Sequence, residues 1–159
     1  MEEINRLRAA FNGDYSVTER PEPIPGDLRV NWGQSLLLLV LASSRGQRCS
    51  LQKVHFLAHL SRTDRSRQQM REVLARRRGP VELSVRIEPW VNRAAAFGAA
   101  NGLLAVRDGK SLSLTEAGKV AVTALRAARV LAAETAFLDE IGKITTEHVV
   151  ENIMKMEAF

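Results

Sequence analysis

The stretch from residue 89 to residue 123 constrains the fold more than any other part of the chain, because it reads as a helix, a hairpin and a second helix. Pro89 suits the first position of a helix, where its missing N–H costs nothing. Apolar residues then recur at roughly helical spacing, and Gly102 provides a C-terminal stop. We therefore expect a helix from about residue 90 to residue 101.

Two short apolar runs follow, at 103–107 and 111–114, and the dipeptide Asp108-Gly109 joins them. This dipeptide favours a tight hairpin turn, because it tolerates the positive φ that such a turn needs. Thr115 then stands where a helix N-cap belongs. The order is typical of a winged-helix domain, and the ending GLLAVRDGKSLSLTEAG resembles the wing of many winged-helix regulators.

The remaining patterns predict mostly helices. A run that is apolar on nearly all sides, 31–44, predicts a central buried helix. The other expected elements are a helix at 50–61 capped by Ser50, a surface helix at 62–78, a half-buried strand at 81–87 that could pair beside the wing, a long helix at 115–134 and a last helix at 147–156.

The predicted fold class is mainly α with a small β-sheet: a winged helix-turn-helix core with a C-terminal helical extension. Residues 1–27 form an N-terminal arm or linker, with three prolines and a glycine between residues 20 and 27. Residues 28–135 form the winged-helix domain, and residues 136–159 form the helical extension.

Composition indicates a soluble cytoplasmic protein. The single cysteine, Cys49, excludes an intramolecular disulfide framework and fits a reducing compartment. The longest apolar run, 36–42, is far shorter than the ~20 residues that span a bilayer. The first ten residues carry acids and no apolar stretch follows them, so we expect no signal peptide and no membrane partner.

Catalytic and metal-binding patterns are weak. His55 and His59 have the spacing of a metal pair on one helix, but the third histidine, His148, lies far along the chain. Helix-edge histidines are the better interpretation. The sequence contains no Gly-x-Ser-x-Gly motif, no P-loop and no carboxylate set typical of a nuclease. We expect a protein that is not an enzyme and that has no metal and no cofactor.

Positive charge is concentrated in the middle third of the chain. Residues 45–93 carry twelve basic and four acidic side chains, a net charge of +8, and eleven of the twelve are Arg. Such a surface suits contact with nucleic-acid phosphates or with an acidic partner. The candidate contact residues are Arg62, Arg65, Arg67, Arg71, Arg76, Arg77, Arg78, Arg93, Arg107 and Lys110. The alternative is a solvated helix face.

The helix before the wing is poorly equipped to read bases. In an ordinary winged helix this helix enters the major groove. Here it offers mainly alanines, and only Asn92 and Arg93 could contact base edges. Any DNA contact is therefore expected to be dominated by phosphates and to be non-specific.

The chain from about residue 28 to residue 154 resembles the middle components of ABC-three-component systems, which include the Lamassu-type anti-phage defence systems. The segments that carry the resemblance are LRVNWGQSLLLLVLAS at 28–43, SLQKVHFLAHLS at 50–61, EPWVNRAAAFGAANGLL at 88–104, LSLTEAG at 112–118 and FLDEIGKITTEHV at 137–149.

The resemblance implies a small non-catalytic winged-helix subunit. Its partners would be a coiled-coil SMC-like or Rad50-like ATPase and an effector, often a nuclease, which it helps to hold together on double-stranded DNA. The last two helices then become a docking surface, through Ile141, Val149, Ile153 and Met154, unless these residues cap the domain's own core. The alternative is a transcription regulator that forms a homodimer through the helix at 115–134.

Overall fold

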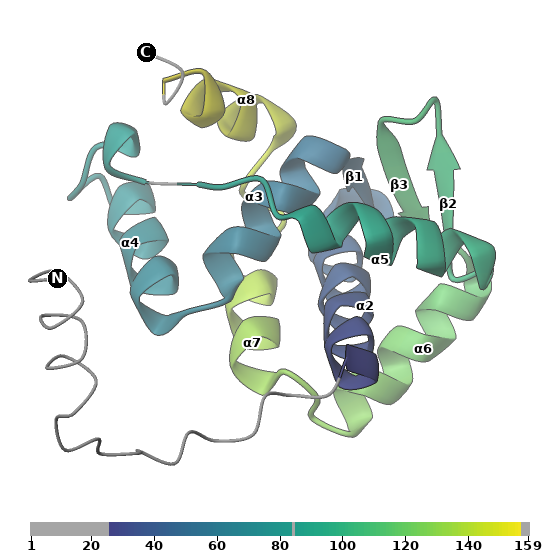
Figure 1. Cartoon of the computed structure of the whole chain (residues 1–159). Coiled ribbons are helices and arrows are strands. Elements are labelled where there is room, and N and C mark those ends of the chain that lie inside the picture. The colour runs from purple at the N-terminus through teal and green to yellow at the C-terminus, as the bar shows by residue number, and fades with distance from the viewer. Residues whose placement is uncertain (1–25, 84, 157–159) are drawn as a thin grey trace, which may run out of the picture.

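The computed structural model describes residues 26–83 and 85–156, which form a mainly helical protein with one small antiparallel sheet (Figure 1). The predicted arm lies outside these residues, apart from its last two positions. The elements in chain order are α2 (Gly26–Ser43), the 3-10 turn η1 (Arg45–Gln47), β1 (Arg48–Ser50), α3 (Leu51–Ser61), α4 (Asp64–Leu74), the 3-10 turn η2 (Pro80–Glu82), α5 (Pro89–Ala100), β2 (Leu104–Arg107), β3 (Ser111–Leu114), α6 (Glu116–Ala127), α7 (Ala132–Ile141) and α8 (Glu147–Met156).

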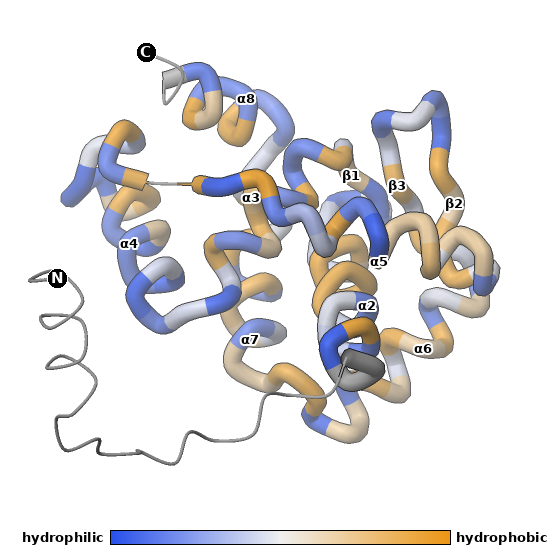
Figure 2. Tube along the Cα trace, in the orientation of Figure 1, coloured by the Kyte–Doolittle hydropathy of each residue, from blue (hydrophilic) through white to orange (hydrophobic). Residues whose placement is uncertain are grey.

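Helix α2 is the centre of the core, as its apolar sequence predicts, although it begins earlier than residue 31. Every residue from Leu36 to Leu41 is at most 2% exposed. The helix packs against α3, α5, α6 and α7, and it stands in the middle of Figure 1. Figure 2 shows the same helix as largely hydrophobic. A helix that is apolar on all sides is stable only when neighbours surround it, so these four helices are arranged around α2, while α4 and α8 pack on α3.

The hairpin, the helix before it and the start of the helix after it match the expectation. Asp108 and Gly109 have φ values of 52° and 63°, and the strands pair Arg107 with Ser111 across the turn. The Thr115 hydroxyl accepts a hydrogen bond from the Gly118 backbone N–H at 3.1 Å and so caps α6. Similarly, Ser50 caps α3, and the Thr146 hydroxyl accepts from Val149 at the start of α8.

The third strand is β1, and the prediction of a strand at 81–87 is wrong for the residues that the structure describes there. The strand order is β1-β3-β2, with Cys49 opposite Leu112. Strand β1 therefore occupies the edge of β3 that another strand would need. The segment from η2 onward instead buries Leu83 completely, packs Val85 partly against the core and leaves Val81 and Ile87 each 67% exposed. Its alternating pattern reflects these core contacts.

The long helix predicted at 115–134 is also wrong, because the chain breaks it into α6 and α7. Arg129 and Leu131 both adopt left-handed backbone conformations with φ of 53°. This reversal turns α7 back so that Phe137 packs into the core with no exposed surface. A bidentate ion pair then joins the two helices, since the Arg126 guanidinium donates to both carboxylate oxygens of Asp139 at 2.6 and 2.7 Å.

Candidate nucleic-acid interface

The Arg-rich segment forms a shorter helix than predicted, because α4 ends at Leu74 rather than near residue 78. Its start is fixed by Thr63, whose hydroxyl accepts a hydrogen bond from the Ser66 backbone N–H. The end is marked by Arg76, which has a left-handed φ of 56°. Arg62 therefore precedes the helix, and Arg76, Arg77 and Arg78 follow it.

Most of the arginines in this segment are paired with acids of the chain itself. Arg62 donates to both carboxylate oxygens of Glu88, and Arg71 lies 2.8 Å from Glu140. The other paired arginines are Arg67, which is buried and donates to Asp64 and to the Ser61 carbonyl, and Arg78, which pairs with Glu72 and Glu82. A paired guanidinium is less able to attract a phosphate, so this segment offers less free charge than its sequence suggests.

Three arginines of the segment keep a free charge within the described chain. Arg65, Arg76 and Arg77 are exposed and form no ion pair with a described acid. Two of the three lie beyond the end of α4. These residues remain candidates for contact with an anionic partner.

Glu88 is the centre of a buried polar cluster that the sequence pattern does not reveal. Its carboxylate accepts hydrogen bonds from Arg62, from His59 Nδ1 at 2.8 Å and from Trp90 Nε1 at 3.0 Å. Its backbone N–H donates to His55 Nδ1 at 3.1 Å. The two histidines considered as a metal pair thus both bind Glu88, which ties the end of α3 to the start of α5.

Burial favours the neutral form of Glu88 and would raise its pKa, but the hydrogen bonds from His59 and Arg62 outweigh burial and lower the pKa of this carboxyl below its ordinary value. The pKa of His55 is lowered mainly by burial. The cluster therefore holds an ionised carboxylate among donors, and it serves to join two helices.

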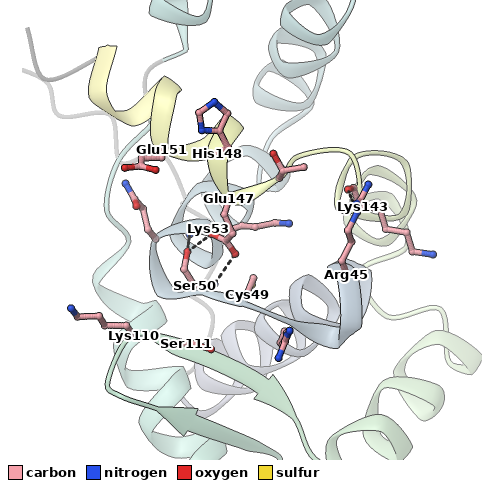
Figure 3. Close-up of a pocket in the computed structure, with 13 residues that line it drawn as sticks. Arg45, Cys49, Ser50, Lys53, Lys110, Ser111, Lys143, Glu147, His148 and Glu151 are labelled. Carbon is pink, nitrogen blue, oxygen red and sulfur yellow. Dashed lines mark hydrogen bonds between the residues drawn. The ribbon is translucent and has the colours of Figure 1, made fainter.

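A separate groove gathers cations from three distant parts of the chain (Figure 3). It has a volume of about 760 Å³, and it lies where β1, the hairpin turn and the loop between α7 and α8 meet. Its lining residues are Arg45, Arg48, Cys49, Ser50, Gln52, Lys53, Lys110, Ser111, Lys143, Thr146, Glu147, His148 and Glu151. Of these, only Lys110 was expected as a contact residue, because the pattern of the sequence does not bring the others together.

The cations of the groove are mostly free of acidic partners. Within residues 26–83 and 85–156, no ion pair is formed by Arg48, Lys110 or Lys143. Arg45 donates through Nε to the Lys143 carbonyl at 3.1 Å, which leaves its positive charge uncompensated. In Figure 3, Arg45 and Lys143 lie on one side of the groove and Lys110 on the other.

Two of the groups that line the groove, Lys53 and Cys49, are themselves buried. Lys53 is only 3% exposed, and its Nζ donates to the Gly142 carbonyl at 2.9 Å. Burial lowers the pKa of Lys53, because desolvation penalises the ammonium. Burial also raises the pKa of the Cys49 thiol to about 11, so this cysteine is a neutral thiol at pH 7.

Glu147 is an acid that faces the same groove. Its carboxylate accepts hydrogen bonds from the Ser50 backbone N–H at 2.9 Å and from the Ser50 hydroxyl at 2.6 Å. A carboxylate at this position complements the positive end of α3. The first turn of α3 therefore already attracts an anion, which the chain itself supplies.

The remaining predicted contact residues lie apart from this groove or at its edge. Arg93 is exposed on α5, and Arg107 is exposed on β2 beside the hairpin turn. The four proposed docking residues are largely occupied by the chain's own core: Ile141 and Ile153 are 0% and 4% exposed, and Val149 and Met154 are partly buried against the core. This placement agrees with the alternative that they cap the domain itself.

The described residues contain no cluster of three or more His, Cys, Asp or Glu side chains that could hold a metal ion. Within the same residues, no helix combines the length and the apolar character needed to cross a membrane. Comparison of the chain with protein-family models, with curated proteins and with solved structures found no match.

Proposed function

We propose that the chain is a non-catalytic winged-helix subunit that acts as a scaffold in an anti-phage defence complex. In this proposal it is the middle component of an ABC-three-component system of the Lamassu type, and it links an SMC-like or Rad50-like ATPase to an effector. The order of α5, hairpin and α6, with a third strand paired to β3, supports the winged-helix assignment. The sequence resemblance described above supports the assignment to this family.

The observation that carries the proposal is the chemistry of the exposed side of α5. In a DNA-reading winged helix, this helix presents Arg, Asn or Gln side chains to base edges. The exposed residues of α5 beyond its first turn are Asn92, Arg93, Ala96, Phe97 and Ala100. Asn92 lies beside His55, and Phe97 leaves 46% of its surface in water. Such a face suits a neighbouring protein better than a base pair.

The structure of the α6 region weighs against the alternative, a dimeric transcription regulator. That hypothesis depends on a long dimerisation helix at 115–134. Helix α6 ends at Ala127, and α7 returns to the core instead of extending away from it. A regulator would need another dimerisation surface.

The first experiment is affinity purification of the tagged protein from its native host, with mass spectrometry of the co-eluting proteins. The scaffold proposal predicts a large coiled-coil ATPase and a third protein in the eluate. Recovery of a homodimer alone would reject the scaffold and leave the regulator.

A variant of the exposed helix separates the two functions further. If the protein is a regulator, Arg93→Ala should abolish binding to its own promoter, because Arg93 is the one free base-reading side chain on the described part of α5. If it is a scaffold, the variant should show no promoter-specific defect. A charge-matched control is Arg76→Ala, which lies outside α5.

A further inference from the structure

The composition of the groove between β1, the hairpin turn and α8 restricts the kinds of ligand that it could bind. It combines cations with short hydroxyl and amide side chains, namely Ser50, Ser111, Thr146 and Gln52. None of its thirteen lining residues is a Leu, Ile, Val, Met, Phe, Tyr or Trp, and the one ring among them is the imidazole of His148. Protein interfaces depend on apolar and aromatic anchors at their centre, so this groove is poorly suited to a protein partner.

The same composition suits a phosphodiester backbone. Phosphate oxygens in protein–DNA complexes accept hydrogen bonds from Arg and Lys, from Ser and Thr hydroxyls and from backbone N–H groups. Single strands, in contrast, are held by aromatic side chains that stack on unpaired bases. The residues that line the groove include one imidazole, His148, and no Phe, Tyr or Trp, so the groove lacks a row of stacking side chains and favours a duplex, whose bases remain stacked on each other.

The charge of the groove also favours an anionic ligand. Five cations line the groove, Arg45, Arg48, Lys53, Lys110 and Lys143, against the two acids Glu147 and Glu151. Glu151 is paired with Lys155 at 2.7 Å, so its charge is largely satisfied outside the groove. Lys53 forms no ion pair with a described acid although it is almost fully buried. Burying a cation is costly. The Glu147 carboxylate already favours the charged form of Lys53, and a phosphate in the groove would favour it further.

We propose that this groove binds the phosphate backbone of double-stranded DNA, with Arg48 and Lys110 as its principal contacts. This inference rests on the proposed function for the choice of DNA. It keeps Lys110 from the residues that the sequence predicts as contacts, but it moves the interface away from the arginines at 62–78. The paired arginines of α4 hold the fold together. The free cations of the groove face the ligand.

The test compares two double variants that change net charge equally. Arg48→Gln with Lys110→Gln removes two exposed cations from the groove, and Arg76→Gln with Arg77→Gln removes two from the end of α4. Binding to a fluorescent 30-base-pair DNA of arbitrary sequence is measured by anisotropy over a range of salt concentrations. The groove variant should weaken binding roughly tenfold and flatten the dependence of log K on log salt by about 2 units, because two phosphate contacts are lost.

The α4 variant should keep nearly wild-type affinity and salt dependence. Equal losses in the two double variants would mean that only net charge matters, and a larger loss in the α4 variant would place DNA on the predicted arginines. Either result overturns the proposal. Circular dichroism and thermal unfolding of each variant exclude loss of fold as the cause.

A single substitution that is expected to strengthen DNA binding provides a further test, because a misfolded variant would not bind DNA more tightly. Glu147→Gln removes a negative charge from the groove and keeps an amide oxygen that can accept from Ser50. It should strengthen DNA binding by roughly threefold, because a repulsive charge beside the phosphates is gone. Unchanged or weaker binding would contradict the proposal.

Competition experiments identify the kind of anion that the groove binds. Unlabelled duplex DNA should displace the probe, whereas single-stranded DNA and polyglutamate at equal charge should displace it poorly. Equal competition by polyglutamate would show a general polyanion surface and would overturn the assignment. Recovery of partner proteins is read separately: the groove variant should retain the co-eluting ATPase, so failure of this inference and failure of the scaffold proposal are distinguishable.

Discussion

The Glu88 cluster makes the most quantitative prediction, because one carboxylate receives three side chains. Glu88→Gln keeps the size of the side chain but removes its charge and one acceptor oxygen. Breaking a buried ion pair by removal of one partner costs 3–5 kcal/mol when both charges are buried. Here the Glu88 side chain is 9% exposed but Arg62 is 45% exposed and can regain water. We therefore expect a loss of about 2 kcal/mol of unfolding free energy at pH 7.

The measurement is urea unfolding followed by tryptophan fluorescence. Trp90 donates to Glu88, and its ring lies 5.1 Å from that of Trp32, so the signal reports on this cluster directly. The midpoint should fall while the slope stays constant, since a change of slope would indicate a change in the denatured state. The control is Glu116→Gln, which removes an exposed carboxylate paired with Lys119 and should leave the midpoint almost unchanged.

The loss of stability in Glu88→Gln should also depend on pH. The pKa of Glu88 is lower in the folded protein than its ordinary value of 4.5. Its ionised form therefore stabilises the fold above that pH, and this contribution is lost as the pH falls through the folded pKa. The difference between wild type and Glu88→Gln should shrink as the pH falls below about 4.5. A difference equal to that of the Glu116 control at pH 7, or one that grows in acid, would refute the role assigned to the cluster.

Three other substitutions test the packing and the backbone by thermal or urea unfolding. Gln34→Met should stabilise the protein by about 1 kcal/mol, because neither polar atom of the buried Gln34 amide has a described partner; a loss of stability would show that the amide is satisfied. Gly118→Ala should cost about 3 kcal/mol or more, because the new Cβ would lie 2.0 Å from the Leu103 carbonyl oxygen; a cost below that of an ordinary Gly→Ala change would refute this close approach. Arg129→Gly should stabilise the protein by about 0.5–1 kcal/mol, because it relieves a left-handed φ; in a continuous helix at 115–134 the same change would destabilise it.

Local signals account for the parts of the fold that the sequence predicts well. The hairpin depends on Asp108 and Gly109, whose backbone preferences act within the turn itself. The starts of α3 and α6 depend on Ser50 and Thr115, and each cap bonds a backbone N–H three residues further on. Such features need no information from distant parts of the chain.

The errors in the sequence-based predictions arise where contacts between residues far apart in the chain decide the structure. Strand β1 has only three residues, too few for an alternating pattern to be recognised, and it exists because β3 pairs with it from more than sixty positions away. The break after α6 falls in an alanine-rich stretch without Gly or Pro. It is stabilised by the return of Phe137 to the core, which local propensity does not contain. The groove likewise collects residues from three segments that a linear pattern keeps apart.

An Arg-rich segment such as 62–78 can serve either to contact phosphates or to attach its helix to the rest of the protein. Arg suits contact with phosphates or with an acidic partner, because its planar guanidinium presents several N–H donors at once. Arg71 uses two of them on Glu140, 69 residues along the chain: its Nε lies 2.9 Å and its Nη2 lies 2.8 Å from the same carboxylate oxygen, Oε2. The Arg71 guanidinium also lies 5.5 Å from the centre of the Phe137 ring. Lysine would supply the charge but not the fork. Attachment of α4 to α7 therefore explains an arginine at position 71 without a nucleic acid, whereas Arg65, Arg76 and Arg77 have no acidic partner among the described residues.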